Sequence, residues 1–342
     1  MTAVLPPPAR IAPPTSAPAG SAPADRSIEL SQARAVAAAI IDAVTAVVAG
    51  QRTAVELATA CLLSRGHLLI EDVPGVGKTL LAQAITGAVG GSFRRIQGSV
   101  DLLPGDVTGT LVPDTHHDHL RLTFRPGPIF ANVVVFDELN RTNPRTQSAL
   151  LEAAEERTVT IDGHSHLLPD PFFLVATQNP IEVAGTFRLG EGTVDRFAAV
   201  VSPGRASFDD EVAVIAGRRG RRQLHDIHPV TTLDALVAVR NTVDGVTIPE
   251  AVSRYVVELL ELTRAHSRVR LGASTRGGLA LIGLARAVAV MRGRDYVVPD
   301  DVIGAAIPGL AHRLVLQDGD GSTTAGASVV AECLRQLRPP SV

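Results

Sequence analysis

The chain has 342 residues, 45% of them apolar and 20% charged, a globular composition with room for two domains. Its formal net charge of −3 excludes an overall basic footprint for nucleic acid or an anionic membrane. The two cysteines, Cys61 and Cys333, lie far apart, which excludes a disulfide framework and a zinc pattern. No apolar run reaches the length of a membrane span and the N-terminus lacks a signal-peptide pattern, so we expect a cytoplasmic protein.

Residues 1–28 are expected to be a disordered tail. Residues 1–25 contain seven Pro and seven Ala, and such a segment buries too little apolar surface to offset the entropy lost on ordering. A docking role for the "PPPAR" stretch in this tail is the alternative. We divide the rest into a first domain, residues 29–203, and a linker with a second, helical domain, residues 204–342.

Helices and strands alternate after the tail. Periodicity predicts helices at residues 31–50, 53–66, 78–90 and 145–157, and strands at 67–71, 93–98, 132–138, 171–178 and 196–202. Five short apolar strands separated by helices predict a parallel sheet covered on both faces. After Pro203 the strand signal fades, and helices are expected at 251–266, 276–290 and 299–314.

A glycine-rich turn joins the first strand to the next helix in "LLIEDVPGVGKTLL". Gly75 and Gly77 let backbone N–H groups point inward and, with the helix N-terminus, form a nest for phosphate oxygens. Lys78 is expected to reach the β- and γ-phosphates, and the Thr79 hydroxyl to bind Mg²⁺. This strand–loop–helix context predicts a phosphate-binding P-loop, although Asp72 stands where the general pattern has Gly.

Two acids follow an apolar strand in "NVVVFDE". Ligands of a parallel sheet bind at the carboxyl ends of its strands, so Asp137 is expected to hold Mg²⁺ and Glu138 to polarise an attacking water. A neighbouring strand ends in Thr177, Gln178 and Asn179, whose amide is suited to hold the same water or the γ-phosphate. The loop and the acids together predict hydrolysis rather than binding alone.

These motifs together resemble the AAA+ ATPases, and closely the MoxR family. The strings that carry the resemblance include "GHLLIEDVPGVGKT", "RRIQGSVDLLPGDVTG", "FDELNRTNPRTQSALLEAAEERTVTIDG", "LPDPFFLVATQNPIEVAGTF", "LGAST" and "AHRL", in family order from Val47 to about Leu314. The resemblance implies an α/β fold: a P-loop αβα sandwich with a five-stranded parallel sheet, two β-hairpin insertions at 105–124 and 157–169, and a C-terminal all-helical lid. It also implies a homo-oligomeric ring, commonly a hexamer.

The resemblance assigns roles residue by residue. Lys78 and Thr79 match Walker A, and Asp137 and Glu138 match Walker B. Asn179 matches sensor 1. Arg196 matches the arginine finger, which acts on the nucleotide of the neighbouring subunit, and Arg276 matches sensor 2, which reaches the nucleotide from the lid. The residues implied to bind ATP are Gly50, Gln51, Val73, Pro74, Gly75, Val76, Gly77, Lys78, Thr79, Leu80 and Asp137, with Thr79 and Asp137 as the Mg²⁺ ligands.

Two departures from the family pattern flank the implied arginines. Gly190 stands where Pro is usual, and Gly277-Gly278 open the helix of Arg276. Each of these two glycines is expected to loosen the helix start by about 1 kcal/mol relative to Ala.

Two short stretches and one arginine each have two alternative interpretations. The tract "DTHHDHL" is a candidate metal site or a solvated hairpin tip. The run "GRRGRR" (217–222) is a contact for nucleic acid or an acidic partner, or a solvated loop. Arg141 reaches a neighbouring subunit or makes a local salt bridge.

Two functions remain open. The first is an ATP-driven remodeller or chaperone that matures client proteins or complexes, since the family is associated with partners carrying von Willebrand factor A domains. The alternative is an AAA+ motor acting on nucleic acid. The net charge and the lack of a DNA-binding module favour the first, with no nucleic acid partner.

Overall fold

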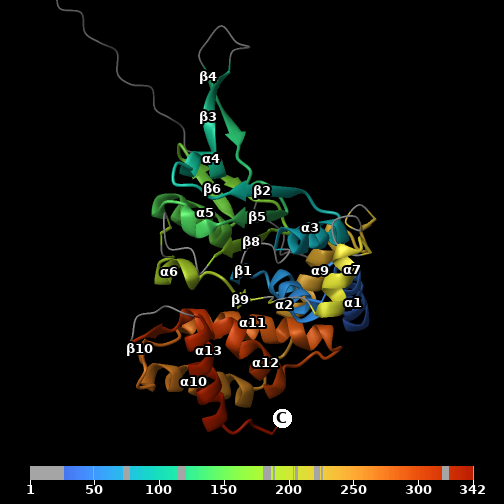
Figure 1. Cartoon of the computed structure of the whole chain (residues 1–342), viewed down its shortest axis with the longest axis vertical. Coiled ribbons are helices and arrows are strands. Elements are labelled where there is room, and N and C mark those ends of the chain that lie inside the picture. The colour runs from blue at the N-terminus through green and yellow to red at the C-terminus, as the bar shows by residue number, and fades with distance from the viewer. Residues whose placement is uncertain are drawn as a thin grey trace, which may run out of the picture.

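A five-stranded parallel sheet forms the centre of the first domain (Figure 1). The computed structural model describes residues 27–48, 50–71, 78–114, 121–179, 186–187, 189–202, 204, 207–218, 224, 226–317 and 323–341. The strand order is β2-β5-β8-β1-β9, and every neighbouring pair is parallel. The strands are β1 (Leu68–Glu71), β2 (Phe93–Gln97), β5 (Val133–Asp137), β8 (Phe173–Gln178) and β9 (Ala199–Val201). The predicted five-stranded parallel sheet is confirmed.

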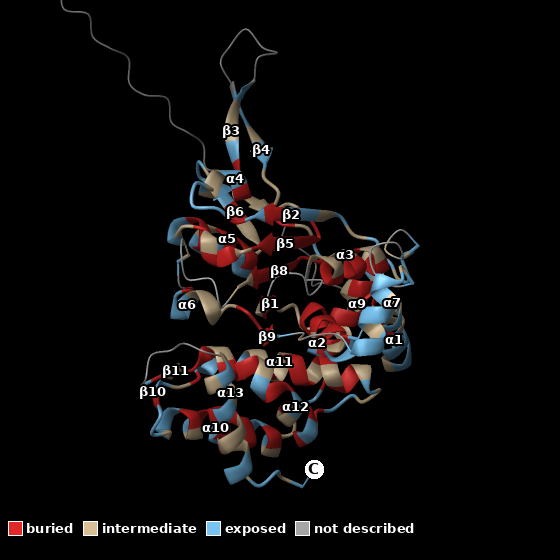
Figure 2. Ribbon diagram, in the orientation of Figure 1, coloured by how far each residue is buried: buried red, intermediate tan, exposed pale blue. Residues whose placement is uncertain are grey.

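Both faces of the sheet are covered, which explains the continuous apolar runs of its strands. Successive side chains of a strand point to opposite faces. Accordingly, Leu68 and Ile70 of β1 belong to one buried cluster, while Leu69 belongs to another. All five residues of β5 are buried between the two clusters (Figure 2).

Helices build the two covering layers. The first cluster takes in buried residues of α1 (Leu30–Val47), α2 (Arg52–Leu63) and α3 (Lys78–Val89), and the second those of α5 (Pro144–Glu156). Among the described helices, α1 alone is long and apolar enough to cross a membrane. Core helices pass the same test of length and composition, and α1 buries six residues: Ala33, Ala37, Ile40, Ile41, Val44 and Val47.

The two expected hairpin insertions are present. After α4 (Pro104–Thr108), β3 (Gly109–Asp114) pairs antiparallel with β4 (Arg121–Pro126) and projects away from the sheet (Figure 1). The second hairpin joins β6 (Thr158–Ile161) to β7 (His164–Leu167). Residues 115–119 of the His-rich tract, and with them its candidate metal site, lie outside the described residues. Within the described residues, no cluster of three His, Cys, Asp or Glu side chains is arranged to hold a metal ion.

The C-terminal part is helical, as predicted. It contains α10 (Glu250–Ala265), α11 (Thr275–Met291), α12 (Pro299–Leu310), the short η2 (Ala311–Arg313) and α13 (Thr323–Gln336). One small antiparallel pair, β10 (Val269–Leu271) with β11 (Val315–Leu316), is an addition to the predicted all-helical lid. Helices α11 and α12 pack against the first domain, through contacts of α11 with α1 and of α12 with β9.

Three described helices of eight or more residues had no counterpart in the sequence prediction: α7 (Phe208–Ile215), α9 (Leu233–Asp244) and α13. Helix α9 packs on α1 and α11, so part of the segment after residue 203 lies against the first domain. The division into residues 1–28, 29–203 and 204–342 stays a prediction.

The paired glycines of α11 have a packing reason. A Cβ on Gly277 would lie 3.0 Å from Cδ of Arg313, and one on Gly278 would lie 2.8 Å from Cδ1 of Leu260. The helix start is capped because the Ser274 hydroxyl accepts a bond from the Gly277 N–H at 3.2 Å. The glycines therefore let α11 approach α10 and Arg313 closely.

Candidate functional site

Asp137 ends β5 at the carboxyl edge of the sheet and is buried. Its Oδ2 accepts bonds from Thr79 Oγ1 at 3.3 Å and from Arg95 Nε at 2.6 Å. Its Oδ1 accepts a bond from Thr177 Oγ1 at 3.3 Å. The carboxylate is thus fixed by three neighbouring elements, α3, β2 and β8.

Glu138 follows directly and adopts the left-handed conformation, with φ 57°. This conformation is uncommon for a residue with a side chain and marks a constrained position. The Glu138 N–H donates to Thr177 Oγ1 at 3.0 Å. The carboxylate oxygen Oε2 accepts from Gln97 Nε2 at 2.8 Å and lies 3.2 Å from Arg141 Nε. The local salt bridge expected as one alternative for Arg141 is therefore present.

The phosphate-loop residues Val73, Pro74, Gly75, Val76 and Gly77 lie outside the described residues. Helix α3 begins at Lys78 and continues through Thr79 and Leu80, directly after that loop. The hydroxyl of Thr79 faces the Asp137 carboxylate. Hydroxyl and carboxylate oxygens are the hard donors that Mg²⁺ prefers, so this pair fits the predicted metal.

Asn179 follows β8 at the same edge, and its carbonyl accepts a bond from Asn140 Nδ2 at 3.4 Å. Gly50, with φ 68°, and the buried Gln51 directly precede α2. The structure thus brings Thr79, Asp137, Glu138 and Asn179 to the carboxyl edge, while Gly50 and Gln51 lie at the start of α2.

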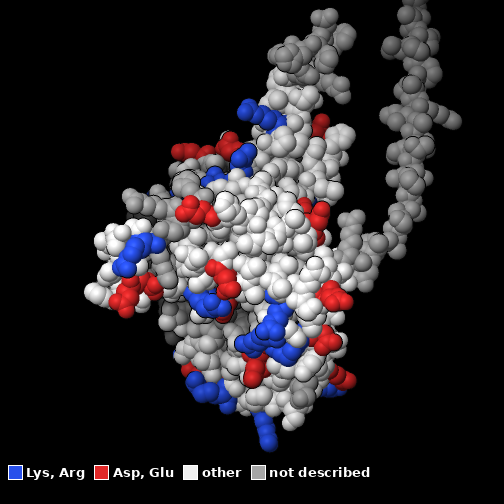
Figure 3. All heavy atoms as spheres, turned by 90° about the vertical axis from the view of Figure 1, so that its right-hand side faces the viewer, with Lys and Arg blue, Asp and Glu red and all other residues white. Residues whose placement is uncertain are grey.

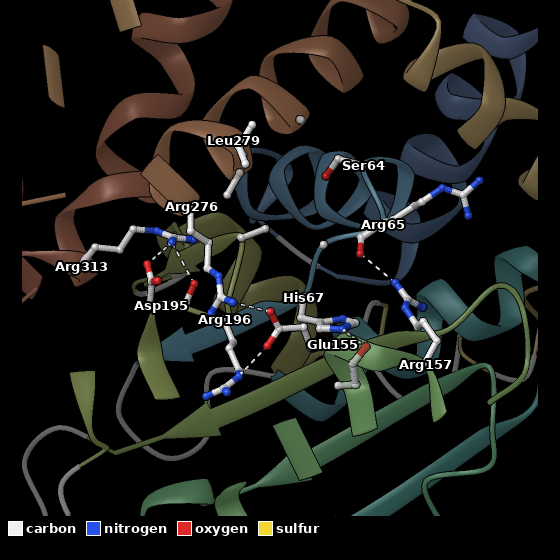
Figure 4. A pocket seen from close by; sticks show the side chains of 15 residues that line it. Ser64, Arg65, His67, Glu155, Arg157, Asp195, Arg196, Arg276, Leu279 and Arg313 are labelled. Atoms are coloured by element: carbon white, nitrogen blue, oxygen red, sulfur yellow. Dashed lines mark hydrogen bonds and ion pairs between the residues drawn. The ribbon is translucent and has the colours of Figure 1, made fainter. Parts of the chain in front are cut away.

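Arg196 and Arg276 meet at a different place. Arg196 Nε lies 2.7 Å from Oε2 of Glu155, and Arg276 Nη2 lies 2.7 Å from Oε1 of the same carboxylate. The three side chains line a cavity of about 320 Å³ between the lid and the first domain. Figure 4 shows both guanidinium groups directed at Glu155, with Arg276 entering from the lid helix α11. We call this cavity the arginine pocket; Arg65, Arg157 and Arg313 also line it.

The arginine pocket lies at the amino edge of the sheet. Its lining includes Gly66 and His67, which directly precede β1, and Arg196, which precedes β9. Because the strands are parallel, Asp137 and Glu138 lie at the opposite edge. Strands of four to six residues rise about 3.3 Å per residue, which separates the edges by roughly 13–20 Å. Arg196 and Arg276 therefore lie away from Asp137 and Glu138.

Arg313 fastens the lid beside Arg196. Its Nη1 donates to the carbonyl of Asp195 at 2.8 Å and to Oδ1 of the same residue, and its Nη2 donates to the Phe197 carbonyl at 2.6 Å. Burial lowers the pKa of Arg313, and the adjacent Asp195 opposes that shift. The segment that carries Arg196 is therefore held from the lid.

A buried histidine fixes the other side of the arginine pocket. His67 Nδ1 accepts from the Leu174 N–H at 3.3 Å, and Nε2 lies 3.2 Å from the Ala154 carbonyl. Burial, with the nearby charge of Arg157, lowers the pKa of His67 to about 3, so the ring is neutral and Nε2–H donates to that carbonyl. This bond fixes the end of α5 at the residue before Glu155.

Several of these residues escaped the sequence analysis. Arg95, Gln97 and Glu155 were given no role, and Arg313 was only part of the "AHRL" string. Alternation along β2 places Arg95 and Gln97 on one strand face, and their register partners on β5 are Val135 and Asp137. The alternation along β2 therefore indicates the positions of Arg95 and Gln97 once β2 is placed beside β5. The position of Glu155, in contrast, depends on the tertiary fold.

The fold and the two acids at the carboxyl edge define the chain as an AAA ATPase. The family model for ATPases associated with various cellular activities matches residues 67–199, and the AAA lid domain model matches residues 261–332. Within that class, the chain belongs to the MoxR family.

Three relatives support this assignment. The chaperone MoxR1 of Mycobacterium tuberculosis is 39% identical over 283 residues, 79% of this chain and 73% of the relative. The protein MoxR of Paracoccus denitrificans is 33% identical over 307 residues, 80% of this chain and 87% of the relative. The protein YeaC of Bacillus subtilis is 42% identical over 276 residues, 81% and 86% of the two chains.

Two solved structures are similar in fold. A crystal structure described as that of an ATPase from Cytophaga hutchinsonii has 32% identity and a TM-score of 0.81, covering 91% of this chain and 97% of that one. A homologue of MCM from Methanopyrus kandleri has 18% identity and a TM-score of 0.54 over 85% and 61% of the two chains, a likeness of fold alone.

Proposed function

We propose that this ATPase works as a homo-oligomeric ring in which each subunit binds ATP at its carboxyl edge and completes its neighbour's site from its amino edge. The observation that carries the proposal is the placement of Arg196 and Arg276 on one carboxylate at the edge opposite Asp137 and Glu138. Positive charge offered to the γ-phosphate accelerates phosphoryl transfer, so arginines placed away from their own nucleotide serve another subunit's.

At the carboxyl edge, Lys78 would contact the β- and γ-phosphates of ATP, and Thr79 and Asp137 would hold Mg²⁺. Mg²⁺ held there would neutralise charge on the phosphate oxygens. Glu138 takes a proton from the attacking water, and Asn179 orients that water or the γ-phosphate. Gln97, which donates to the Glu138 carboxylate, keeps this side chain in place.

At the amino edge, Arg196 is the arginine finger and Arg276 the lid arginine, sensor 2. Both act on the adjacent subunit, because both belong to the arginine pocket. The family resemblance implied that Arg276 reaches a nucleotide from the lid. We propose more specifically that this nucleotide is the one bound by the adjacent subunit. A six-membered ring is the assembly that the family resemblance favours.

The proposed output is remodelling or maturation of client proteins in the cytoplasm. The relative MoxR1 is named a chaperone, which supports a function in remodelling other proteins. Proteins with von Willebrand factor A domains are the partners that the family resemblance suggests. The hairpin of β3 and β4, which projects from the sheet, is the element best placed to touch a client (Figure 1).

The alternative function is a nucleic-acid motor. On the face shown in Figure 3, basic and acidic side chains of the described residues alternate and leave wide uncharged areas. Arg219, Arg221 and Arg222 of the "GRRGRR" run lie outside the described residues. A DNA-binding assay at several salt concentrations separates the two functions, because a motor shows a steep dependence of log K on log salt.

Mixing two inactive variants tests the proposed mechanism. Arg196→Ala should bind ATP normally yet hydrolyse it about 10³-fold more slowly, and Glu138→Gln should bind ATP but not activate water. In mixed rings some sites pair an intact Glu138 with an intact Arg196 from the neighbour, so activity should recover. If mixed assemblies form and no activity returns at any ratio, Arg196 does not act across the subunit boundary.

A further inference from the structure

Glu155 forms ion pairs with both Arg196 and Arg276 in the arginine pocket. Each carboxylate oxygen takes a different partner: Oε2 lies 2.7 Å from Arg196 Nε, and Oε1 lies 2.7 Å from Arg276 Nη2 (Figure 4). The three residues come from α5, from the segment after α6 (Glu191–Val194) and from the lid helix α11. One carboxylate therefore joins the finger segment and the lid.

We propose that Glu155 is a positioning residue that holds Arg196 and Arg276 as one paired unit for the nucleotide of the adjacent subunit. The inference rests on the proposed in-trans mechanism and deepens it. Two guanidinium groups repel each other when they stand side by side, and a carboxylate between them removes that repulsion. Two positive charges and one negative charge leave a net +1 for an arriving phosphate.

The backbone that carries Glu155 is itself fixed. His67 binds the carbonyl of the preceding residue, Ala154, at 3.2 Å. Two residues later, Arg157 donates to the carbonyls of Phe172 at 2.9 Å and Arg65 at 2.8 Å. The carboxylate therefore stands on a rigid support, whereas both arginines have long flexible side chains. A fixed acceptor is what orients such side chains before a ligand arrives.

The arginines have little else to orient them. Besides Glu155, the Arg196 guanidinium has one further hydrogen-bond acceptor among the described residues, the Gly192 carbonyl, at 2.9 Å. The side chain of Arg276 is half exposed, at 50%, and its ion pair within the described part of the chain is with Glu155. Among the described residues, Glu155 is thus the principal restraint on Arg276, and its removal should spread both guanidinium groups over several rotamers.

Helix α5 connects this unit to the other edge. It starts just after the Walker B segment and ends beside Glu155, and its 13 residues span roughly 20 Å. Helix α5 therefore begins beside this chain's own proposed nucleotide site and carries Glu155, which positions the arginines for the nucleotide of the adjacent subunit. A displacement of α5 moves Glu155, and with it both arginines.

The first experiment compares Glu155→Ala with Glu155→Asp and with the control Glu152→Ala. Glu152 is an exposed acid one turn earlier on α5, and it forms no ion pair with the described residues. Glu155→Ala should lower kcat by about 10- to 100-fold, the scale of a misplaced reacting group, and leave ATP affinity and the melting temperature unchanged. Glu155→Asp keeps the charge on a shorter side chain and should recover part of kcat, and Glu152→Ala should match wild type.

The second experiment mixes Glu155→Ala with Glu138→Gln, in parallel with the mixture of Arg196→Ala and Glu138→Gln. The Glu155→Ala subunits keep Glu138 and receive well-placed arginines from the Glu138→Gln neighbours, so activity should recover. Wild-type or faster turnover by Glu155→Ala overturns the positioning role. Recovery with Arg196→Ala but not with Glu155→Ala overturns it as well, and failure of both mixtures overturns the in-trans mechanism beneath it.

Discussion

Replacing Arg313 with Ala should separate the lid from the finger segment. The Arg313 side chain is almost fully buried, at 2% exposure, and donates to three backbone carbonyls and to Asp195. Breaking a buried ion pair costs about 3–5 kcal/mol. Because Asp195 keeps partial contact with solvent, we expect the lower end, about 3 kcal/mol. With an unfolding entropy of about 2.1 cal/mol/K per residue, a chain of 342 residues should show a fall in melting temperature of roughly 4 °C.

The assay is thermal unfolding followed by circular dichroism, together with ATP turnover measured well below both melting temperatures. Turnover should also fall, because Asp195 directly precedes Arg196. Arg254→Ala is the matched control: its ion pair with Glu250 is exposed, and such pairs contribute only about 0.2–1 kcal/mol. If Arg313→Ala melts at the temperature of Arg254→Ala, the reasoning about the lid contact is refuted.

Three further substitutions test the site and the packing. Lys78→Ala should weaken ATP binding in a titration, because it removes the cation at the β- and γ-phosphates, and unchanged affinity would contradict the P-loop assignment. Glu138→Gln should keep ATP binding while turnover falls by about 10²-fold or more, and undiminished turnover would place the base elsewhere. Gly278→Ala should lower the melting temperature, because the added Cβ would lie 2.8 Å from Leu260 Cδ1. The control Gly304→Ala on α12, where an added Cβ would meet no atom within 4 Å, should be neutral or stabilising. Equal shifts in melting temperature for the two variants would contradict the packing argument.

The central sheet was predictable because its sequence signal is local. A strand buried on both faces is a short apolar run, and "VVVFD" is buried at all five positions. The place of Asp137 and Glu138 at the carboxyl edge was predictable for the same reason, since Asp137 ends this run and Glu138 follows it. Helix α9 also carried a readable start, Thr232, whose hydroxyl accepts from the Ala235 N–H, but its interior charge obscured the pattern.

That charge is Arg240, which is fully buried. Its guanidinium donates to the carbonyls of Leu62 and Phe172, residues 178 and 68 positions away in the chain. Burial, with the nearby arginines, lowers its pKa to about 9. A charged residue within a helix is normally expected at the surface, so only the tertiary structure reveals acceptors of this kind. The same limit applies to Glu155, whose two arginines lie far along the chain.

The separation of the two edges predicts how binding and hydrolysis depend on protein concentration. Lys78, Thr79 and Asp137 belong to one chain, so an isolated subunit should bind ATP. In the proposed ring the carboxyl edge of one copy meets the amino edge of the next, a heterologous contact, so a lone subunit would lack the neighbour's Arg196 and Arg276. On dilution, ATP affinity should therefore stay constant while turnover per subunit falls, and turnover should rise with the assembled fraction. Light scattering measures that fraction, and full turnover in a preparation shown to be monomeric would rule out the dependence on a neighbour.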